Sequence, residues 1–445
     1  MNITLILISL IVLIPSSYQL PVIALPLGYF YITLVEMMII FIFFLWGMQA
    51  LFSSAPKVVR PLFSKYVILI LCLFVIYIFF GLFQRNAIGV LGDFRQYMPL
   101  VLYFPLLHAL RNQMAVEKLR GMLFFSLIII AIYIIVIFFF FNSALVAYAA
   151  KGNIGFTGER IFIDNSVFLF FAYLGYIVAA FFAGPMGGLR RIVYFAIIFL
   201  SILVLLIMQV RSFWIMTAII LFLSFFSLTR AIHKFKYAFV AIVSTFVIII
   251  LVFLTLQATG FRSKAIDNIK DRFASFSDMD KIGKTGAKRT ESIGSIETRM
   301  ATAEYALEKY IIPNWFFGLG FGAQTPMVNT FGAKGLMKYQ IDNGYLTLLL
   351  KFGVFGLFFY ALFTLKITWS LFRIIFNPLT GQEDIWLAKS FLYAIIAMIA
   401  GSFFTSIFIR EQVCIVSFVI MLCEIEWINK RITINRAAKS GHHAK

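Results

Sequence analysis

Most of this 445-residue chain is apolar: 62% of its residues are hydrophobic, only 13% are charged, and the mean hydropathy is +0.97. A soluble domain is roughly 45–50% apolar and about 25% charged, so the composition excludes a soluble globular protein of this length. Runs such as 121–141 supply the ~20 apolar residues that a helix needs to cross a bilayer. The sequence therefore predicts an all-α, polytopic membrane protein.

The net charge of +19 is spread over the loops and forms no basic stripe on a folded domain, so we do not expect nucleic-acid binding. The first residues, MNITLILISLIVLIP, lack the basic start and the small-residue cleavage site of a signal peptide and predict a retained first helix. All three cysteines fall in apolar stretches, which favours neither a disulfide nor a metal site.

Polar breaks between hydrophobic runs predict about twelve membrane spans. In chain order they cover approximately 3–14, 29–52, 66–82, 97–110, 121–141, 163–183, 192–209, 212–228, 237–256, 343–365, 388–407 and 412–427.

Lysine and arginine are more frequent in one set of alternate short loops, which starts at 53–65 and ends with the basic tail 428–445. Short loops decide orientation under the positive-inside rule, whereas loops longer than ~60 residues count little. We therefore expect both termini in the cytoplasm and the long loop 257–342 on the outer face. The chain then divides into helices 1–9 (1–256), this loop, helices 10–12 (343–427) and the tail.

The long loop contains two segments with helical periodicity, 267–276 and 297–310. Between them, 278–295 is polar and punctuated by glycine and serine, which predicts an irregular segment. A glycine-rich turn with aromatic residues follows at 314–326. Its GLGFG motif has no preceding strand and no following Lys-Ser/Thr pair, so we do not expect a nucleotide site there.

Outward segments hold most of the unusual polar side chains. These are Arg95 before the fourth span, Glu159, Arg160 and Asn165 in a glycine-punctuated loop, Arg211 in a very tight turn, and Arg299 in the long loop. An arginine fork matches phosphate oxygens in pairs, so Arg211 beside Arg160 and Arg299 would suit a diphosphate. The four histidines fall in or beside cytoplasmic segments, which argues against zinc or a histidine base on the outer face.

The segment IDNGYLTLLLKFGVFGL (341–357) begins with residues suited to water or a turn and continues as an apolar helix. Lys351 lies nine residues after Asp342, ~13 Å along a helix with ~1.5 Å rise per residue. Glu36 is similarly placed in the second span. Because isolated charges at such depth are costly and usually paired, we predict an ion pair between Lys351 and Glu36. The alternative is that Lys351 snorkels or lines a lipid-carrier groove.

Four segments resemble the O-antigen ligase and Wzy-type polysaccharide polymerase superfamily of bacterial inner membranes. In order, they are GFTGERIFIDNS, VRSFWIMTAIILFL, ETRMATAEYALEKYIIPNWFFGLGFG and IDNGYLTLLLKFGVFGL. The resemblance covers roughly 150–430 and implies a GT-C-type glycosyltransferase architecture. In the ligases, the last segment has a histidine that is expected to act catalytically. Here that position is Asp342, which favours a polymerase.

The resemblance implies an enzyme without metal or cofactor that transfers a growing glycan from undecaprenyl diphosphate onto a lipid-linked repeat unit. Preorganised cations must stabilise the leaving diphosphate, a role we expect for Arg160, Arg211 and Arg299. Asp342, with Glu159 as second candidate, is expected to orient or deprotonate the acceptor hydroxyl. The substrate-binding residues predicted are Arg95, Asn165, Asn343, Tyr345 and Trp315, with interfacial anchoring as the alternative role of the aromatics.

The partners implied are membrane lipids, undecaprenyl-diphosphate-linked oligosaccharides, a chain-length regulator and a flippase. Two alternative functions remain open. One is glycan ligase activity within the same superfamily. The other is a lipid-linked oligosaccharide flippase or transporter, a class that places charges near the bilayer midplane on broken helices. Only Glu36 and Lys351 are expected so deep, and an 86-residue outer loop is long for transport.

Overall fold

The computed structural model describes fourteen parts of the chain: residues 3–13, 24–27, 30–52, 61–84, 87–140, 167–183, 187–207, 211–228, 234–236, 239, 291–328, 334–338, 341–404 and 412–442. Two expected elements, the span at 237–256 apart from residue 239 and the loop helix at 267–276, therefore lie outside the described residues.

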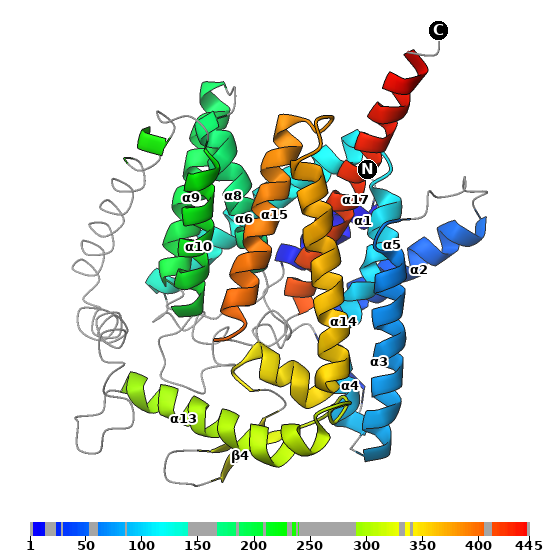
Figure 1. Ribbon diagram of the computed structural model, residues 1–445, viewed down its shortest axis with the longest axis vertical. Coiled ribbons are helices and arrows are strands. Elements are labelled where there is room, and N and C mark those ends of the chain that lie inside the picture. Colours follow the sequence, from blue (N-terminus) through cyan, green and yellow to red (C-terminus); the bar gives the residue numbers. More distant parts are fainter. Residues whose placement is uncertain are drawn as a thin grey trace.

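The described chain is predominantly helical (Figure 1). Its α-helices are α1 (Ile3–Leu13), α2 (Leu34–Phe52), α3 (Ser64–Gln84), α4 (Ala87–Phe94), α5 (Tyr103–Ala109), α6 (Gln113–Phe140), α8 (Val167–Ala183), α9 (Gly188–Ile207), α10 (Arg211–Ser227), α13 (Glu291–Ala306), α14 (Gly344–Ile375), α15 (Gln382–Gly401) and α17 (Gln412–His442). Short 3-10 segments, η2 (Met98–Leu102) and η5 (Ile312–Asn314), and a π-helical turn, η4 (Leu307–Ile311), complete the helical elements.

Three of these helices are long and apolar enough to cross a membrane by length and composition: Ser64–Phe83, Gly344–Ile375 and Gln382–Gly401. Six further apolar helices in the described part of the chain have 10–17 residues. One of them, Met98–Ala109, consists of η2 followed directly by α5. It contains two prolines, which interrupt regular helical hydrogen bonding. The molecule is thus a largely helical membrane protein, while twelve spans and a GT-C fold stay predictions.

Two small antiparallel hairpins accompany the helices of this mostly helical chain. In the first, β1 (Ala24–Leu27) pairs with β2 (Phe30–Thr33); in the second, β3 (Thr325–Val328) pairs with β4 (Lys334–Lys338). Residues 30–33 were expected inside the second span. Their sequence, FYIT, consists of aromatic and β-branched residues that also favour strands, which hydropathy alone does not distinguish.

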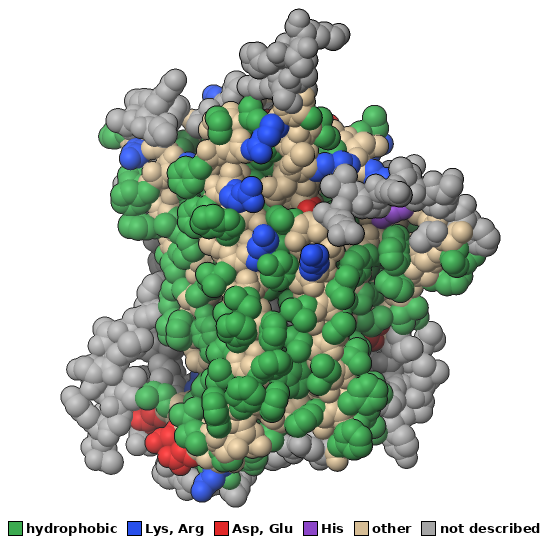
Figure 2. All heavy atoms as spheres, turned by 45° about the vertical axis from the view of Figure 1, so that its right-hand side comes forward, with side chains coloured by type: hydrophobic (Ala, Val, Ile, Leu, Met, Phe, Trp, Pro, Cys, Tyr) green, Lys and Arg blue, Asp and Glu red, His purple; other side chains and the backbone are tan. Residues whose placement is uncertain are grey.

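The long helices run side by side, and α13 lies across one end of them (Figure 1). At the opposite end, α17 extends beyond the other helices. In the face shown in Figure 2, hydrophobic side chains cover the middle and lower parts, whereas lysine and arginine gather toward the α17 end. The α13 end and the basic end are therefore opposite ends of the molecule.

The core is centred on α8, whose residues from Phe168 to Ala180 are buried almost without exception. A helix that is apolar on all sides is expected inside a bundle, and α8 packs against α15, α10, α9 and α17. Gly175 permits a close approach of α8 to α15, because a Cβ there would lie 3.2 Å from the Cα of Ser390 on α15. This packing fixes α15, and through it the start of α14.

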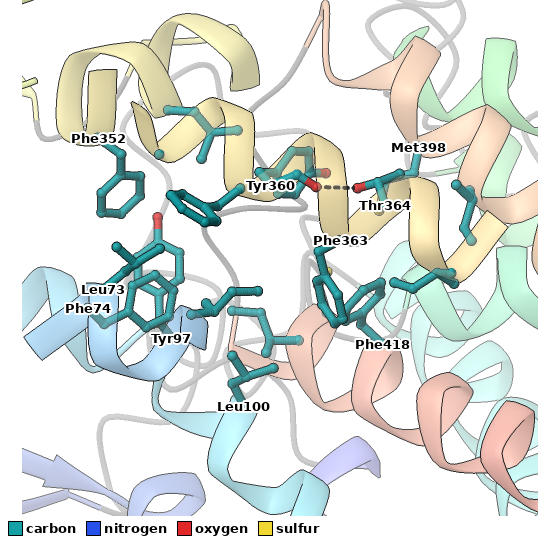
Figure 3. A pocket seen from close by; sticks show the side chains of 18 of the residues that line it. Leu73, Phe74, Tyr97, Leu100, Phe352, Tyr360, Phe363, Thr364, Met398 and Phe418 are labelled. Carbon is teal, nitrogen blue, oxygen red and sulfur yellow. Dashed lines mark hydrogen bonds between the residues drawn. The ribbon is translucent and has the colours of Figure 1, made fainter. Parts of the chain in front are cut away.

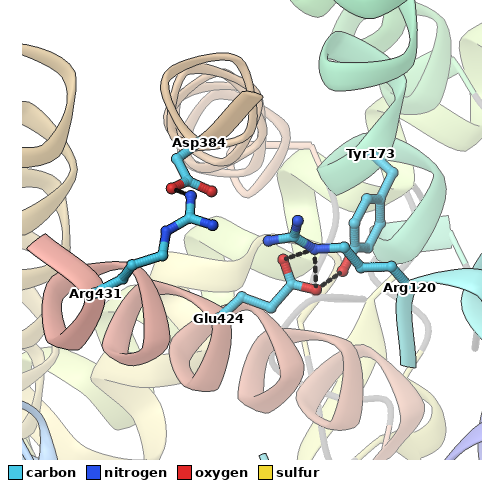
Figure 4. Close-up of polar contacts among 5 residues, drawn as sticks. All are labelled: Arg120, Tyr173, Asp384, Glu424 and Arg431. Atoms are coloured by element: carbon cyan, nitrogen blue, oxygen red, sulfur yellow. Dashed lines mark hydrogen bonds and ion pairs between the residues drawn. The ribbon is translucent and has the colours of Figure 1, made fainter. Parts of the chain in front are cut away.

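At the basic end, ion pairs with buried carboxylates tie α17 to its neighbours (Figure 4). Glu424 accepts hydrogen bonds from Arg120 Nε (3.3 Å) and Tyr173 OH (2.9 Å), while Arg431 pairs with Asp384. Burial lowers the pKa of Arg431, and the neighbouring Arg120 guanidinium acts in the same direction. These contacts lie far from the α13 end.

Candidate functional site

Asp342 immediately precedes the first residues of α14 at the α13 end of the molecule. Its Oδ2 atom lies 3.2 Å from Arg299 Nε on α13, and both side chains are about half exposed (46% and 49%). The pair thus joins two residues that sequence reasoning assigned to the site from separate motifs. Since each group is open to solvent, a ligand can reach both the guanidinium and the carboxylate.

The start of α14 is fixed by its own cap and by α15. Asn343 accepts a hydrogen bond from Leu346 N (3.0 Å), the usual arrangement for an asparagine N-cap, and its amide donates to Phe403 O (3.0 Å). Tyr345 OH donates to Ile399 O (2.8 Å). Asn343 and Tyr345 therefore dock α14 on the end of α15, and sugar binding by either residue stays a prediction.

α13 begins six residues before the helix expected at 297–310, and strand β3 holds it in place. Thr302 Oγ1 accepts from Val328 N (3.0 Å) and donates to Val328 O (3.1 Å). Thr302 is buried one helical turn beyond Arg299, so this contact determines where Arg299 lies. Trp315, which follows α13 and two short turns, has a side chain that is 57% exposed and open to a ligand or to lipid.

α14 is broken at Gly353, whose backbone is left-handed (φ 61°). The glycine-rich turn satisfies the hydrogen bonds lost at the break. Leu319 N donates to Leu350 O, and Gly320 N donates to Lys351 O; each N···O distance is 2.8 Å. On the other side of the break, Trp315 O accepts from Val354 N (2.8 Å).

The turn fits against the break because its glycines also adopt left-handed conformations. A Cβ on Gly318 (φ 69°) would lie 2.6 Å from Gly353 N, so the two backbones approach more closely than any side chain allows. Phe321, fully buried, anchors the turn by packing edge-on against Phe352 with ring centroids 5.3 Å apart. The broken helix and the turn therefore form one unit.

The predicted ion pair between Lys351 and Glu36 is wrong. Lys351 pairs with Asp93 of α4, and both side chains are completely buried. The other carboxylate oxygen of Asp93 accepts a hydrogen bond from Gly322 N (3.1 Å) in the glycine-rich turn. Sequence reasoning missed this partner because Asp93 falls between the predicted spans 66–82 and 97–110. The apolar run AIGVLG before it was a signal for the short apolar helix α4, of which Val90 and Asp93 are the buried residues.

Glu36 occupies the first turn of α2, not the middle of a span. It forms a reciprocal capping pair with Thr33, in which Glu36 Oε2 accepts from Thr33 N (2.8 Å) and Thr33 Oγ1 from Glu36 N (3.3 Å). Its other oxygen lies 3.4 Å from Arg95 Nε. Arg95, predicted to bind substrate, is thus engaged with Glu36 and only 20% exposed.

An apolar cavity lies between α3, α14, α15 and α17 (Figure 3). Its volume is about 140 Å³, and it is open on one side. Phe74, Tyr97 and Phe352 lie on the left of the view, Phe363 and Phe418 lie right of its centre, and Met398 lies farther right. On α14 the lining starts at Leu348, fewer than two turns beyond Asp342, and it continues to Ile367. The cavity therefore extends along α14 from near the ion pair.

The remaining predicted site residues are not placed. Glu159, Arg160 and Asn165 lie outside the described residues, and Arg211 is described only as the first backbone position of α10. Convergence of the three arginines thus stays a prediction, with Arg299 alone located.

Residues 196–361 match the model of a protein family described as O-antigen ligase. The match confirms the resemblance to this superfamily over a shorter range than expected. It contains Arg211, Arg299, Trp315 and 342–345, whereas Arg95 and 159–165 lie outside it. Members of this family are membrane enzymes that transfer glycans. No curated protein matches the chain.

Proposed function

Because residues 196–361 match the family described as O-antigen ligase, we propose that the protein is a Wzy-type polysaccharide polymerase. It transfers a growing glycan from undecaprenyl diphosphate onto a lipid-linked repeat unit at the outer face of a bacterial inner membrane. The family match does not separate polymerases from ligases. The aspartate at position 342, where ligases have a histidine, favours polymerase.

The observation that carries the proposal is the half-exposed ion pair between Arg299 and Asp342. In the transfer, the acceptor hydroxyl attacks the anomeric carbon of the donor, and the bond to the diphosphate oxygen breaks with its electron pair. Asp342 takes the proton of the hydroxyl as general base. Arg299 stabilises the charge that develops on the diphosphate, with Arg160 and Arg211 as its proposed partners.

The apolar cavity supports a lipid-linked substrate. Its aromatic and aliphatic lining suits a polyprenyl chain, since such a chain offers only apolar surface for binding. Leu348 and Met398 line its end nearest the start of α14, so a chain lying in it would leave its diphosphate near Arg299. Trp315 is proposed to contact the sugar, or to anchor the loop at the membrane surface.

One observation favours the flippase alternative: α14 is broken and carries a buried charge near the break. Transporters use such breaks to expose backbone groups to their cargo. Here the glycine-rich turn occupies Leu350 O, Lys351 O and Val354 N, and Asp93 neutralises Lys351. The break therefore offers no free groups at these positions, and polymerase remains the proposed function.

The test is the lipid-linked and surface glycan of a strain from which the gene has been deleted. Loss of a polymerase shortens the glycan to single repeat units, because the units are still made, flipped and attached. Expression of the wild-type protein from a plasmid should restore the ladder of lengths. Full-length polymer retained on the carrier in the deletion strain would identify a ligase instead. Repeat units confined to the inner leaflet would identify a flippase.

A further inference from the structure

We propose that Asp93 is the positioning residue that holds Arg299 and Asp342 at the separation needed for glycan transfer. The inference rests on the proposed function of that pair. Asp93 lies on α4, far in sequence from both residues, and contacts neither of them. Its two carboxylate oxygens instead hold the two structural units that carry them.

The first unit is the first half of α14. One oxygen of Asp93 pairs with Lys351, just before the break at Gly353. Asp342 lies at the other end of the same half-helix, beyond the Asn343 cap. Asn343 and Tyr345 dock the start of this half-helix on α15, and the pairing of Lys351 with Asp93 fixes its other end.

The second unit is the glycine-rich turn with β3 and α13. The other oxygen of Asp93 accepts from Gly322 N, only three residues before β3 begins. Strand β3 bonds Thr302 of α13 through both the N–H and the C=O of Val328. Arg299 lies one turn from Thr302 on α13. A chain of defined contacts thus runs from Asp93 to the guanidinium.

The two units meet again at the break in α14, where backbone hydrogen bonds join the turn to Leu350 and Lys351. Those bonds align the units with each other. Asp93 ties both units to α4, which packs on α3, and this tie adds to the contacts that Asn343 and Tyr345 make with the end of α15. Its carboxylate is fully buried, so substrate does not reach it and its effect on the reaction must be indirect.

The test replaces the ion pair with apolar side chains of similar size in D93L/K351M. Buried ion pairs replaced in this way generally leave proteins folded, whereas both ties of Asp93 are lost. The matched control is D384L/R431M, which removes a charged pair at the basic end. A third variant, T302V, removes only the hydrogen bonds between Thr302 of α13 and Val328 of β3.

Spin labels on M300C and L365C report the position of α13 relative to the bundle. Both positions are more than half exposed, at 57% and 64%, and the exposed Cys72 is first replaced by alanine. For D93L/K351M we expect a broader distance distribution than in the parent or control. We also expect a roughly 10²-fold lower kcat with little change in KM, because small misplacements of reacting groups have effects of this size.

An unchanged distance distribution in folded D93L/K351M would overturn the proposal. A broadened distance distribution together with the kcat of the parent protein would overturn it as well. If this variant does not fold, T302V decides by the same two measurements: the broadening and lower kcat support the proposal, and parental values overturn it. Absence of transferase activity in the parent would instead count against the proposed function, because the distances are measured without substrate.

Discussion

Two ion pairs near the α13 end differ in how far they are exposed to solvent. Arg299 and Asp342 are half exposed, and pairs of that kind contribute only ~0–1 kcal/mol to stability. Asp93 and Lys351 are completely buried, where loss of one partner typically costs about 3–5 kcal/mol. The first pair is therefore free to exchange partners with a ligand, whereas the second pair is part of the framework.

Substitutions of Asp342 should alter transfer without altering the amount of protein. Asparagine keeps size and polarity but accepts no proton as a carboxylate does, so D342N should yield single repeat units. Histidine can act as a base near neutral pH, so D342H should retain part of the polymer ladder. Glycan gels and immunoblots of membranes measure both properties. An inert D342H beside a fully active D342N would remove Asp342 from the mechanism.

Arg299→Lys separates charge from geometry at the same pair. Lysine retains the positive charge but loses the planar fork that binds two phosphate oxygens. We expect polymer yield to fall at least about 10-fold, with protein level unchanged, since one charge-assisted hydrogen bond contributes about 1.5–3 kcal/mol. Glycan gels of complemented deletion strains measure the yield. A fully active R299K would reduce Arg299 to a simple positive charge.

Lys351→Met should lower the free energy of unfolding by about 3–5 kcal/mol, because it leaves the Asp93 carboxylate buried without a cation. The second substitution, in D93L/K351M, should recover most of this loss. Denaturant unfolding in detergent measures the three free energies. If K351M is as stable as the parent, the buried pair is not an essential part of the fold.

At the scale of elements, the broken helix and the glycine-rich turn depend on each other. Gly353 has φ 61°, and a Cβ there would lie 2.3 Å from Phe316 O. Gly353→Ala therefore combines a clash with a backbone strain of roughly 1–3 kcal/mol and should reduce the amount of folded protein. Gly121→Ala is the matched control, because a Cβ there meets nothing within 4 Å. Size-exclusion profiles of the two variants make the comparison.

The sequence predicts some of these elements but not the contacts between them. The apolar runs that became α3, α14 and α15 are local properties, and hydropathy predicts them. The break at Gly353 depends on hydrogen bonds from a turn more than thirty residues earlier, so the local pattern predicts one continuous helix. The partner of Lys351 was missed for the same reason. Arg299 and Asp342 were predicted as site residues because each belongs to a segment that resembles the family, and the structure shows that the two side chains pair.

At the scale of the whole molecule, the candidate site and the basic residues occupy opposite ends. The Arg299–Asp342 pair lies at the end crossed by α13, while the Arg431–Asp384 pair lies toward the far end, where lysine and arginine gather (Figures 1 and 2). Basic ends of membrane proteins face the cytoplasm by the positive-inside rule. The arrangement therefore agrees with a site that faces outward, which is where lipid-linked repeat units are joined in the proposed reaction.

Reporter fusions test this orientation directly. An enzyme that is active only outside the cytoplasm should be active when fused after Lys284, in the long loop that leads to α13. The same enzyme fused after Lys236, in a basic short loop, should be silent, because positive short loops are retained in the cytoplasm. A reporter that works only in the cytoplasm should give the complementary pattern at both positions. The reversed pattern would put Arg299 and Asp342 in the cytoplasm, where the flipped repeat units of the proposed reaction are absent, and would exclude the polymerase assignment.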